Sequence, residues 1–98
     1  MKASLHPKVA YELQERCGKR AEEVFKGTYS YAVTYECHYN MKLNKCIMLI
    51  VTPGYKSLVD VNEHQEYGTI FYDHGRIEGR ECKSVEECNS FVKKMMTE

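Results

Sequence analysis

The stretch YSYAVTYECHYNMKLNKCIMLIVT, residues 29–52, decides the fold of this 98-residue chain. From Tyr29 to Tyr39 large side chains alternate with small or polar ones, which is the period of two that is typical of a half-buried β-strand. Lys45 to Thr52 is apolar on both faces, as in a central strand. The polar segment Asn40 to Asn44 lies between the two runs. The sequence therefore predicts an antiparallel hairpin.

A second hairpin is predicted directly after the first. The Pro-Gly pair at residues 53–54 suits the centre of a type II turn. Residues 57–61 and 66–72 then have the composition of strands. Gly68, inside the second of these strands, is expected at a bulge or at a close approach of two backbones. Residues 73–75 are expected to end the sheet as a turn.

One helix is predicted on each side of the strands. Before them, Pro7 suits a first helical turn and Gly27 a last one, and an apolar stripe with helical spacing comprises Val9, Leu13, Cys17, Ala21, Val24 and Phe25. After them, Ser84 and Glu87 form a capping box, and the apolar stripe comprises Cys88, Phe91, Val92, Met95 and Met96. The predicted fold is α+β, with an N-terminal helix, a four-stranded antiparallel meander sheet and a C-terminal helix in a single domain, residues 1–98.

Composition excludes some classes of partner. The chain is 43% hydrophobic and 29% charged, which is typical of a globular domain. Fourteen basic residues balance fourteen acidic ones and are interleaved with them, so no basic stripe is available for nucleic acid. The longest apolar run, Cys46 to Val51, is far shorter than the roughly 20 residues of a membrane span. We expect neither a nucleic-acid partner nor a membrane span.

The cysteines suggest a disulfide-stabilised domain, although sequence alone does not choose among the possible pairings. Cys17 lies on the inward stripe of the first helix and Cys46 opens the strand that this helix is expected to cover. A bond between them would join helix to sheet and stabilise the fold by about 3.6 kcal/mol. Cys82 and Cys88 bracket the predicted helix start, where a bond would fix the entry of the chain. Cys37 would then be a free thiol.

Other states of the cysteines stay open at this point. A direct Cys37 to Cys46 bond across the first hairpin requires a four-residue loop at residues 40–43. Alternatively, all five cysteines are reduced and packed as small apolar side chains. We predict no metal site, because Cys82 and Cys88 lack CxxC spacing and no two histidines stand one helical turn apart.

Neither a catalytic constellation nor a cofactor site is predicted. Cys37 and His38 resemble a thiol with its base, but consecutive residues of a strand point to opposite faces. His64 and His74 fall in predicted turns, and no acid–base pair can be assembled. We therefore do not expect an enzyme.

Four tyrosines give the best route to a function. Tyr29, Tyr31, Tyr35 and Tyr39 form a stripe on one face of the first predicted strand. The stripe packs in the core with its hydroxyls at the edge, or, if the helices cover the other face, it is an exposed aromatic patch of the kind that marks binding surfaces. The four tyrosines are candidate binding residues.

Three segments resemble a family of small uncharacterised bacterial proteins: YECHYNMKLNKCIML at 35–49, LVDVNEHQEYGTIFY at 58–72 and CKSVEECNSFVKKMM at 82–96. The core of the resemblance is the HYNxKLNKC motif at 38–46, and together the segments cover most of the chain. Such proteins usually carry an export signal, so the resemblance implies a periplasmic or secreted protein. It implies no activity, and Cys37 and Cys88 depart from the family's pattern.

We therefore expect a small exported, non-enzymatic module, stabilised by disulfides, that binds an unidentified protein or small ligand. The alternative is a cytosolic thiol-reactive or metal-binding protein that uses Cys37 or the Cys82 and Cys88 pair. Residues 1–7 contain no apolar segment resembling a signal peptide. An exported protein would have lost its signal from this chain, and a cytoplasmic location is the alternative.

Overall fold

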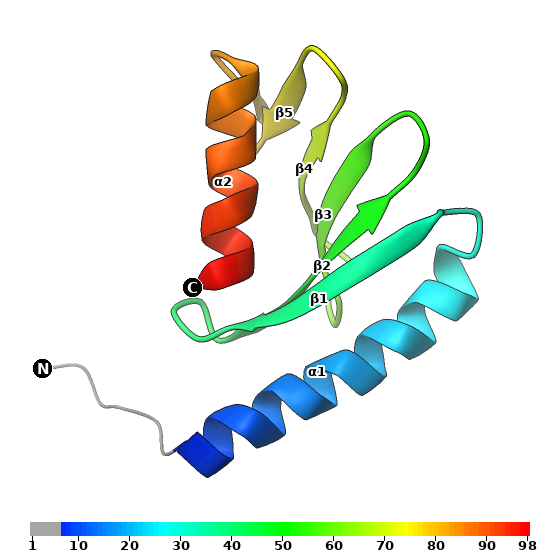
Figure 1. Ribbon diagram of the computed structural model, residues 1–98, viewed down its shortest axis with the longest axis vertical. Coiled ribbons are helices and arrows are strands. Elements are labelled where there is room, and N and C mark those ends of the chain that lie inside the picture. Colours follow the sequence, from blue (N-terminus) through cyan, green and yellow to red (C-terminus); the bar gives the residue numbers. More distant parts are fainter. Residues whose placement is uncertain (1–6) are drawn as a thin grey trace, which may run out of the picture.

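The structure, a computed structural model, describes residues 7–98. It contains two helices and one antiparallel sheet, which confirms the predicted α+β class (Figure 1). The strands follow one another across the sheet in chain order, so the sheet is a meander. The elements are α1 (Pro7–Thr28), β1 (Thr34–Asn40), β2 (Lys45–Val51), β3 (Lys56–Asp60), β4 (Glu66–Ile70), β5 (Gly75–Ile77), β6 (Arg80–Glu81) and α2 (Val85–Thr97).

The prediction of four strands is wrong, because the sheet has six. The two additional strands, β5 and β6, form a short hairpin before α2. Its turn contains Glu78 and Gly79, with φ angles of 49° and 81°. Two successive residues with positive φ are typical of a type I′ hairpin turn. Strands of three and two residues are too short to show an alternating pattern in the sequence.

The first strand begins at Thr34 and not at Tyr29. α1 continues past Gly27 to Thr28, and the Tyr29 N–H donates to the Phe25 carbonyl (2.9 Å). The Ala32 N–H then donates to the Tyr29 carbonyl (2.9 Å), so the chain turns at this point. Tyr29 and Tyr31 therefore lie in the connection between α1 and β1. The alternation of residues 29–33 does not reflect a strand.

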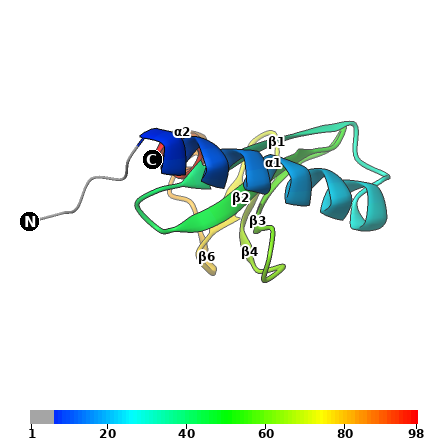
Figure 2. The same ribbon diagram turned by 90° about the horizontal axis from the view of Figure 1, so that it is seen from below.

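The two helices cover opposite faces of the sheet (Figure 1), and α1 lies across the sheet in the view from below (Figure 2). The core on the α1 face contains Cys17, Ala21 and Val24 together with Cys46, Met48, Ile50, Val59 and Val61. The core on the α2 face contains Ile47, Leu49, Leu58 and Met95. Alternate residues of β2 thus point to different helices, and all of residues 46–50 are buried. This confirms the prediction of a central strand that is apolar on both faces.

Gly68 occupies an irregular point in the sheet. Leu58 pairs with Gly68 but Val59 pairs with Glu66, so β4 contains one extra residue at this bulge. A Cβ atom on Gly68 would lie 2.8 Å from the carbonyl oxygen of Arg76 on β5. Both features expected of this glycine, a bulge and a close backbone approach, occur here.

One disulfide joins α1 to β2. The Sγ atoms of Cys17 and Cys46 are 2.13 Å apart, and both side chains are buried. The hairpin loop has four residues, 41–44, but it lies one position later than a direct Cys37 to Cys46 bond requires. Cys37 is consequently opposite Met48, and Cys46 is opposite Tyr39. The alternative Cys37 to Cys46 pairing is therefore wrong, and Cys37 is a free thiol.

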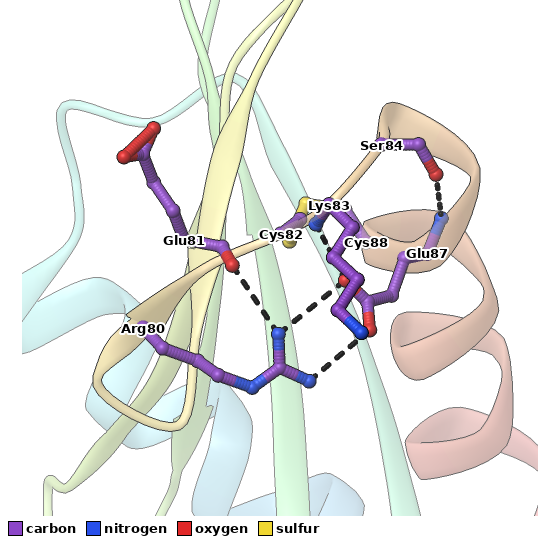
Figure 3. The surroundings of a disulfide bond; sticks show 7 residues. All are labelled: Arg80, Glu81, Cys82, Lys83, Ser84, Glu87 and Cys88. Atoms are coloured by element: carbon purple, nitrogen blue, oxygen red, sulfur yellow. Dashed lines mark hydrogen bonds and ion pairs between the residues drawn. A yellow bond between two sulfur atoms is a disulfide. The ribbon is translucent and has the colours of Figure 1, made fainter.

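A second disulfide joins the end of β6 to α2 (Figure 3). The Sγ atoms of Cys82 and Cys88 are 1.98 Å apart. Cys88 is completely buried against β5, where a Cβ atom on Gly75 would lie only 2.7 Å from its Sγ atom. The Cys82 N–H donates to the Gly75 carbonyl (2.9 Å). A glycine at position 75 thus allows the disulfide to lie directly on the sheet.

The start of α2 is capped as the sequence predicts. The Ser84 hydroxyl accepts a hydrogen bond from the Glu87 N–H (3.1 Å), and the Glu87 carboxylate accepts one from the Lys83 N–H (2.6 Å). Arg80 forms an ion pair with the same carboxylate (3.1 Å; Figure 3). Hydrogen bonding from Arg80 is the main reason that the pKa of Glu87 lies below its usual value. Cap, ion pair and disulfide together attach the β5–β6 hairpin to α2.

Candidate binding surface at one end of the sheet

Successive connections of an antiparallel meander lie at alternate ends of the sheet. The α1–β1, β2–β3 and β4–β5 connections therefore share one end, as the pairing of Thr34 with Val51 and of Lys56 with Ile70 shows. These three connections carry many of the aromatic side chains outside the core. We call this surface the aromatic end, and it consists of Tyr29, Tyr31, Tyr55, Phe71, Tyr72 and His74.

Most of these aromatic side chains contact one another in a chain across the strands. The ring centroids of Tyr29 and Tyr31 are 6.2 Å apart, and those of Tyr55 and Phe71 are 5.6 Å apart. The imidazole of His74 stacks on Phe71 at 4.9 Å with an interplanar angle of 14°. Hydrogen bonding with Tyr55 is the main reason that the pKa of Tyr31 is raised. The chain of contacts thus continues from the α1–β1 connection to the β4–β5 turn.

Large parts of these rings are exposed to solvent. Tyr31 is 63% exposed, Phe71 40% and Tyr72 95%. Beside them is a hollow of about 300 Å³ between the two hairpin turns and the first turns of α2. It is lined by Thr52, Pro53, Gly54, Tyr55, Lys56, Ile70, Phe71, Tyr72, Val85 and Asn89. An apolar surface of this kind has no role in the core.

The polar groups beside the aromatic end are mostly engaged with one another. The Ser57 hydroxyl donates to the Glu66 carboxylate (2.9 Å). The negative charge of Glu66 contributes to raising the pKa of Tyr29 and Tyr31, although burial is the larger cause for Tyr29. The hydroxyls of Tyr29 and Tyr31 are therefore neutral at physiological pH.

Asp73 and His74 form a carboxylate–imidazole pair within the aromatic end. The His74 Nδ1 and Asp73 Oδ1 atoms are 2.6 Å apart, and hydrogen bonding with His74 is the main cause of the lowered pKa of Asp73. Their side chains are 60% and 75% exposed. A catalytic pair of this type normally acts on a positioned nucleophile, and this pair lies on the surface in a tight turn. We therefore assign it to the turn and its stacking on Phe71.

The structure separates the four candidate tyrosines. Tyr35 packs under α1, with its ring 4.4 Å from that of Phe25, and Tyr29 packs at the edge of the same core. Tyr39 is half-buried, and its hydroxyl donates to Asn44. Only Tyr31 of the four is largely exposed, and it lies in a connection rather than on a strand. The stripe is thus divided between the core and the aromatic end.

Sequence reasoning missed Tyr55, Phe71, Tyr72 and His74 as members of the candidate surface. The signal was present, because aromatic residues flank both the Pro-Gly turn at 53–54 and the turn at 72–74. In a meander these turns lie at the same end of the sheet. Most of the tyrosine stripe, by contrast, packs against the core on the α1 face.

The free thiol does not have the properties of a reactive cysteine. Cys37 is partly buried on the α1 face, where Gly18 approaches its Sγ atom, and burial raises the pKa of the thiol. A reactive cysteine requires a lowered pKa and a positive environment. His38 points to the opposite face, as the strand pattern predicts, and its buried Nε2 atom has no hydrogen-bond partner. Burial lowers the pKa of His38.

Comparisons with known proteins do not indicate a function for this surface. No family model, no curated protein and no solved structure matches the chain. Within residues 7–98 no cluster of three or more histidine, cysteine or acidic side chains is placed to hold a metal ion. Within the same residues no helix combines the length and the apolar character needed to cross a membrane. The surface itself is therefore the basis of the functional assignment.

Proposed function

We propose that this protein is a small exported, non-enzymatic module that binds another protein through its aromatic end. The observation that carries the proposal is the exposure of Tyr31, Phe71 and Tyr72 on one continuous surface. Tyrosine and other aromatic side chains are enriched at the centres of protein interfaces and contribute most to their binding energy. Single exposed aromatic side chains are normal, whereas a contiguous group of them marks an interaction surface.

The shape of the surface favours a protein partner over a small molecule. The hollow beside Tyr72 is shallow and has exposed residues on its rim, whereas sites for small ligands enclose most of the ligand surface. A hollow of about 300 Å³ accepts one or two side chains of a partner. The rings around it are then covered by the partner's surface.

Two observations support export. Four of the five cysteines lie in pairs at disulfide distance, and disulfides persist mainly in oxidising compartments. The resemblance of the 38–46 motif to exported bacterial proteins points the same way. A chain of this size also gains proportionally more stability from disulfides than a large domain does.

Photo-crosslinking tests the binding surface directly. A photoreactive amino acid replaces Tyr72 in the full chain, and the protein is irradiated in the extracellular or periplasmic fraction of its own organism. We expect one defined adduct with a partner protein. A matched control places the same amino acid at Tyr11, which is 68% exposed on the first turns of α1, far along the helix from the aromatic end. Equal adducts from both positions, or none from Tyr72, would contradict the proposal.

Intact mass after thiol alkylation tests export. Protein recovered from its native compartment is denatured and alkylated with and without prior reduction. We expect one alkylated thiol, Cys37, before reduction and all five cysteines alkylated after it. Five alkylated thiols before reduction would show that the disulfides do not form in the native compartment and would exclude an oxidising location.

A further inference from the structure

A second cavity lies far from the aromatic end, between α1 and the start of β2. It has a volume of about 320 Å³ and is lined by Leu13, Arg16, Cys17, Arg20, Tyr39, Cys46 and Asn62. The Cys17–Cys46 disulfide, Leu13 and Tyr39 give it an apolar wall. Its volume is close to that of the hollow beside Tyr72, but its lining is more apolar, as is typical of sites for small ligands.

Two arginines, Arg16 and Arg20, are among the residues that line this cavity. Arg16 and Arg20 are one helical turn apart on α1, so their side chains project from the same face of the helix. The spacing of Glu12 and Arg16 favours an ion pair, but within residues 7–98 Arg16 forms none. Arg20 has one exposed ion pair with Glu23, at 3.3 Å. Positive charge at the cavity is therefore only partly neutralised.

No acidic side chain lines the cavity. The carboxylates of Asp60, at the end of β3, and Glu63, on the β3–β4 turn, both contact Lys45 instead, at 3.5 and 2.8 Å. Asn62 adds an amide that can accept or donate a hydrogen bond at the same edge. The cavity thus combines a mostly apolar lining with two arginines and one asparagine among its residues.

We propose that this cavity binds a small organic acid that has one carboxylate and an apolar body, such as a medium-chain fatty acid. The carboxylate lies between Arg16 and Arg20, where charge-assisted hydrogen bonds are strongest. The apolar body lies against Leu13 and the disulfide. This site is independent of the aromatic end, and neither proposal requires the other.

Titration with octanoate, followed by the backbone amide signals of the ¹⁵N-labelled full chain, tests the proposal. We expect saturable shifts that are concentrated at residues 13–20, 46 and 62. Replacing both arginines, R16Q with R20Q, should weaken octanoate binding by about tenfold or more, because the variant loses the charge-assisted hydrogen bonds to the carboxylate. The variant Lys19→Gln removes the same charge from an exposed position of α1 outside the cavity and should bind as the native chain does.

Two further probes separate the contributions to binding. Octanol retains the apolar body without the charge, and inorganic phosphate retains an anion without the apolar body. We expect both to bind more weakly than octanoate. Octanol binding as tightly as octanoate would refute the role of the arginines, and phosphate binding as tightly would refute the role of the apolar wall. Unchanged octanoate affinity in the arginine variant, or no octanoate shifts at these residues, would overturn the proposal.

Discussion

The side chains at the two ends of the sheet differ in what they contact. At the end formed by the β1–β2 and β3–β4 turns, polar side chains tie the chain to itself. Buried Asp60 accepts hydrogen bonds from the Asn62 and Glu63 amides (2.9 and 3.0 Å) and from the Tyr67 hydroxyl (3.3 Å). Buried Asn40 donates to the Met95 carbonyl (2.9 Å). We call this the polar end.

The aromatic end has polar contacts too, such as those of the Thr52 hydroxyl with the Tyr55 backbone (2.9 and 3.0 Å), but they lie within single turns. Its rings contact mainly one another, and Tyr31 and Tyr72 are largely exposed. Side chains at the polar end therefore contribute to folding, whereas those at the aromatic end leave apolar area that folding does not bury. This difference is the reason to assign the binding of a partner protein to the aromatic end. Substitutions at the two ends should accordingly separate stability from binding.

Removal of the disulfide near the polar end should have the largest effect. Replacing both Cys17 and Cys46 by alanine should lower the free energy of unfolding by about 3.6 kcal/mol, since the bond closes a separation of 29 residues. The same change at Cys82 and Cys88, with a separation of 6 residues, should cost about 2.2 kcal/mol. Urea unfolding of both variants measures the difference. An equal loss of unfolding free energy in the two variants, or a larger loss from the Cys82 and Cys88 change, would show that loop-closure entropy does not determine how much these disulfides stabilise the fold.

The carboxylate of Asp60 should be the next most important group. Asp60→Ala removes an acceptor that serves two turn amides and a tyrosine hydroxyl, and should cost about 2 kcal/mol. Asp60→Asn keeps one acceptor oxygen and should cost less. Urea unfolding gives both values, and binding of the partner by the folded variants should not change. Loss of partner binding in a folded Asp60 variant would contradict the assignment of partner binding to the aromatic end.

Serine substitutions at the aromatic end should have the opposite effect. The combined variant Tyr31→Ser, Phe71→Ser and Tyr72→Ser should lose about 1 kcal/mol in unfolding free energy, most of it from Phe71, because Tyr31 and Tyr72 are largely exposed whereas Phe71 is 40% exposed. It should lose most of its binding to the partner. A loss of stability as large as that of Asp60→Ala would mean that the rings are structural.

The smallest expected effect is a pH dependence from His38. Burial lowers the pKa of this imidazole from its usual 6.5, so the unfolded chain binds its proton more readily than the folded one. The stabilising contribution is complete above pH 6.5 and declines as the pH falls below that value. Unfolding of the native chain and of His38→Gln between pH 5 and 8 measures it. Parallel curves for the two proteins would show that His38 does not titrate on unfolding.

Much of the fold follows from the sequence because its signals are local. The α1 stripe, the capping box at Ser84 and the apolar run of β2 are each contained in one continuous segment of chain. The β5–β6 hairpin does not, because its strands depend on pairing with β4 and on the disulfide beside Gly75. Its only sequence signal is the Glu-Gly turn at 78–79.

The candidate site was harder to predict than the fold because its residues are far apart in the sequence. The order of the strands brings them to one end of the sheet. Whether Tyr35 is core or surface depends on which face α1 covers, and no residue of that strand encodes the choice. Grouping Tyr31 with Tyr55 and Phe71 requires knowing that their connections share one end of the sheet. Once the meander is assumed, that grouping follows from the order of the strands.

Competition for the Tyr72 crosslink tests the central claim most directly. The photoreactive protein is irradiated with its partner in the presence of excess unlabelled native chain or excess Tyr31, Phe71 and Tyr72 serine variant, with folding of each competitor checked beforehand. If the aromatic end is the recognition surface, the native chain abolishes the adduct and the serine variant leaves it nearly unchanged. Suppression of the adduct by the serine variant to the same extent as by the native chain would contradict the account.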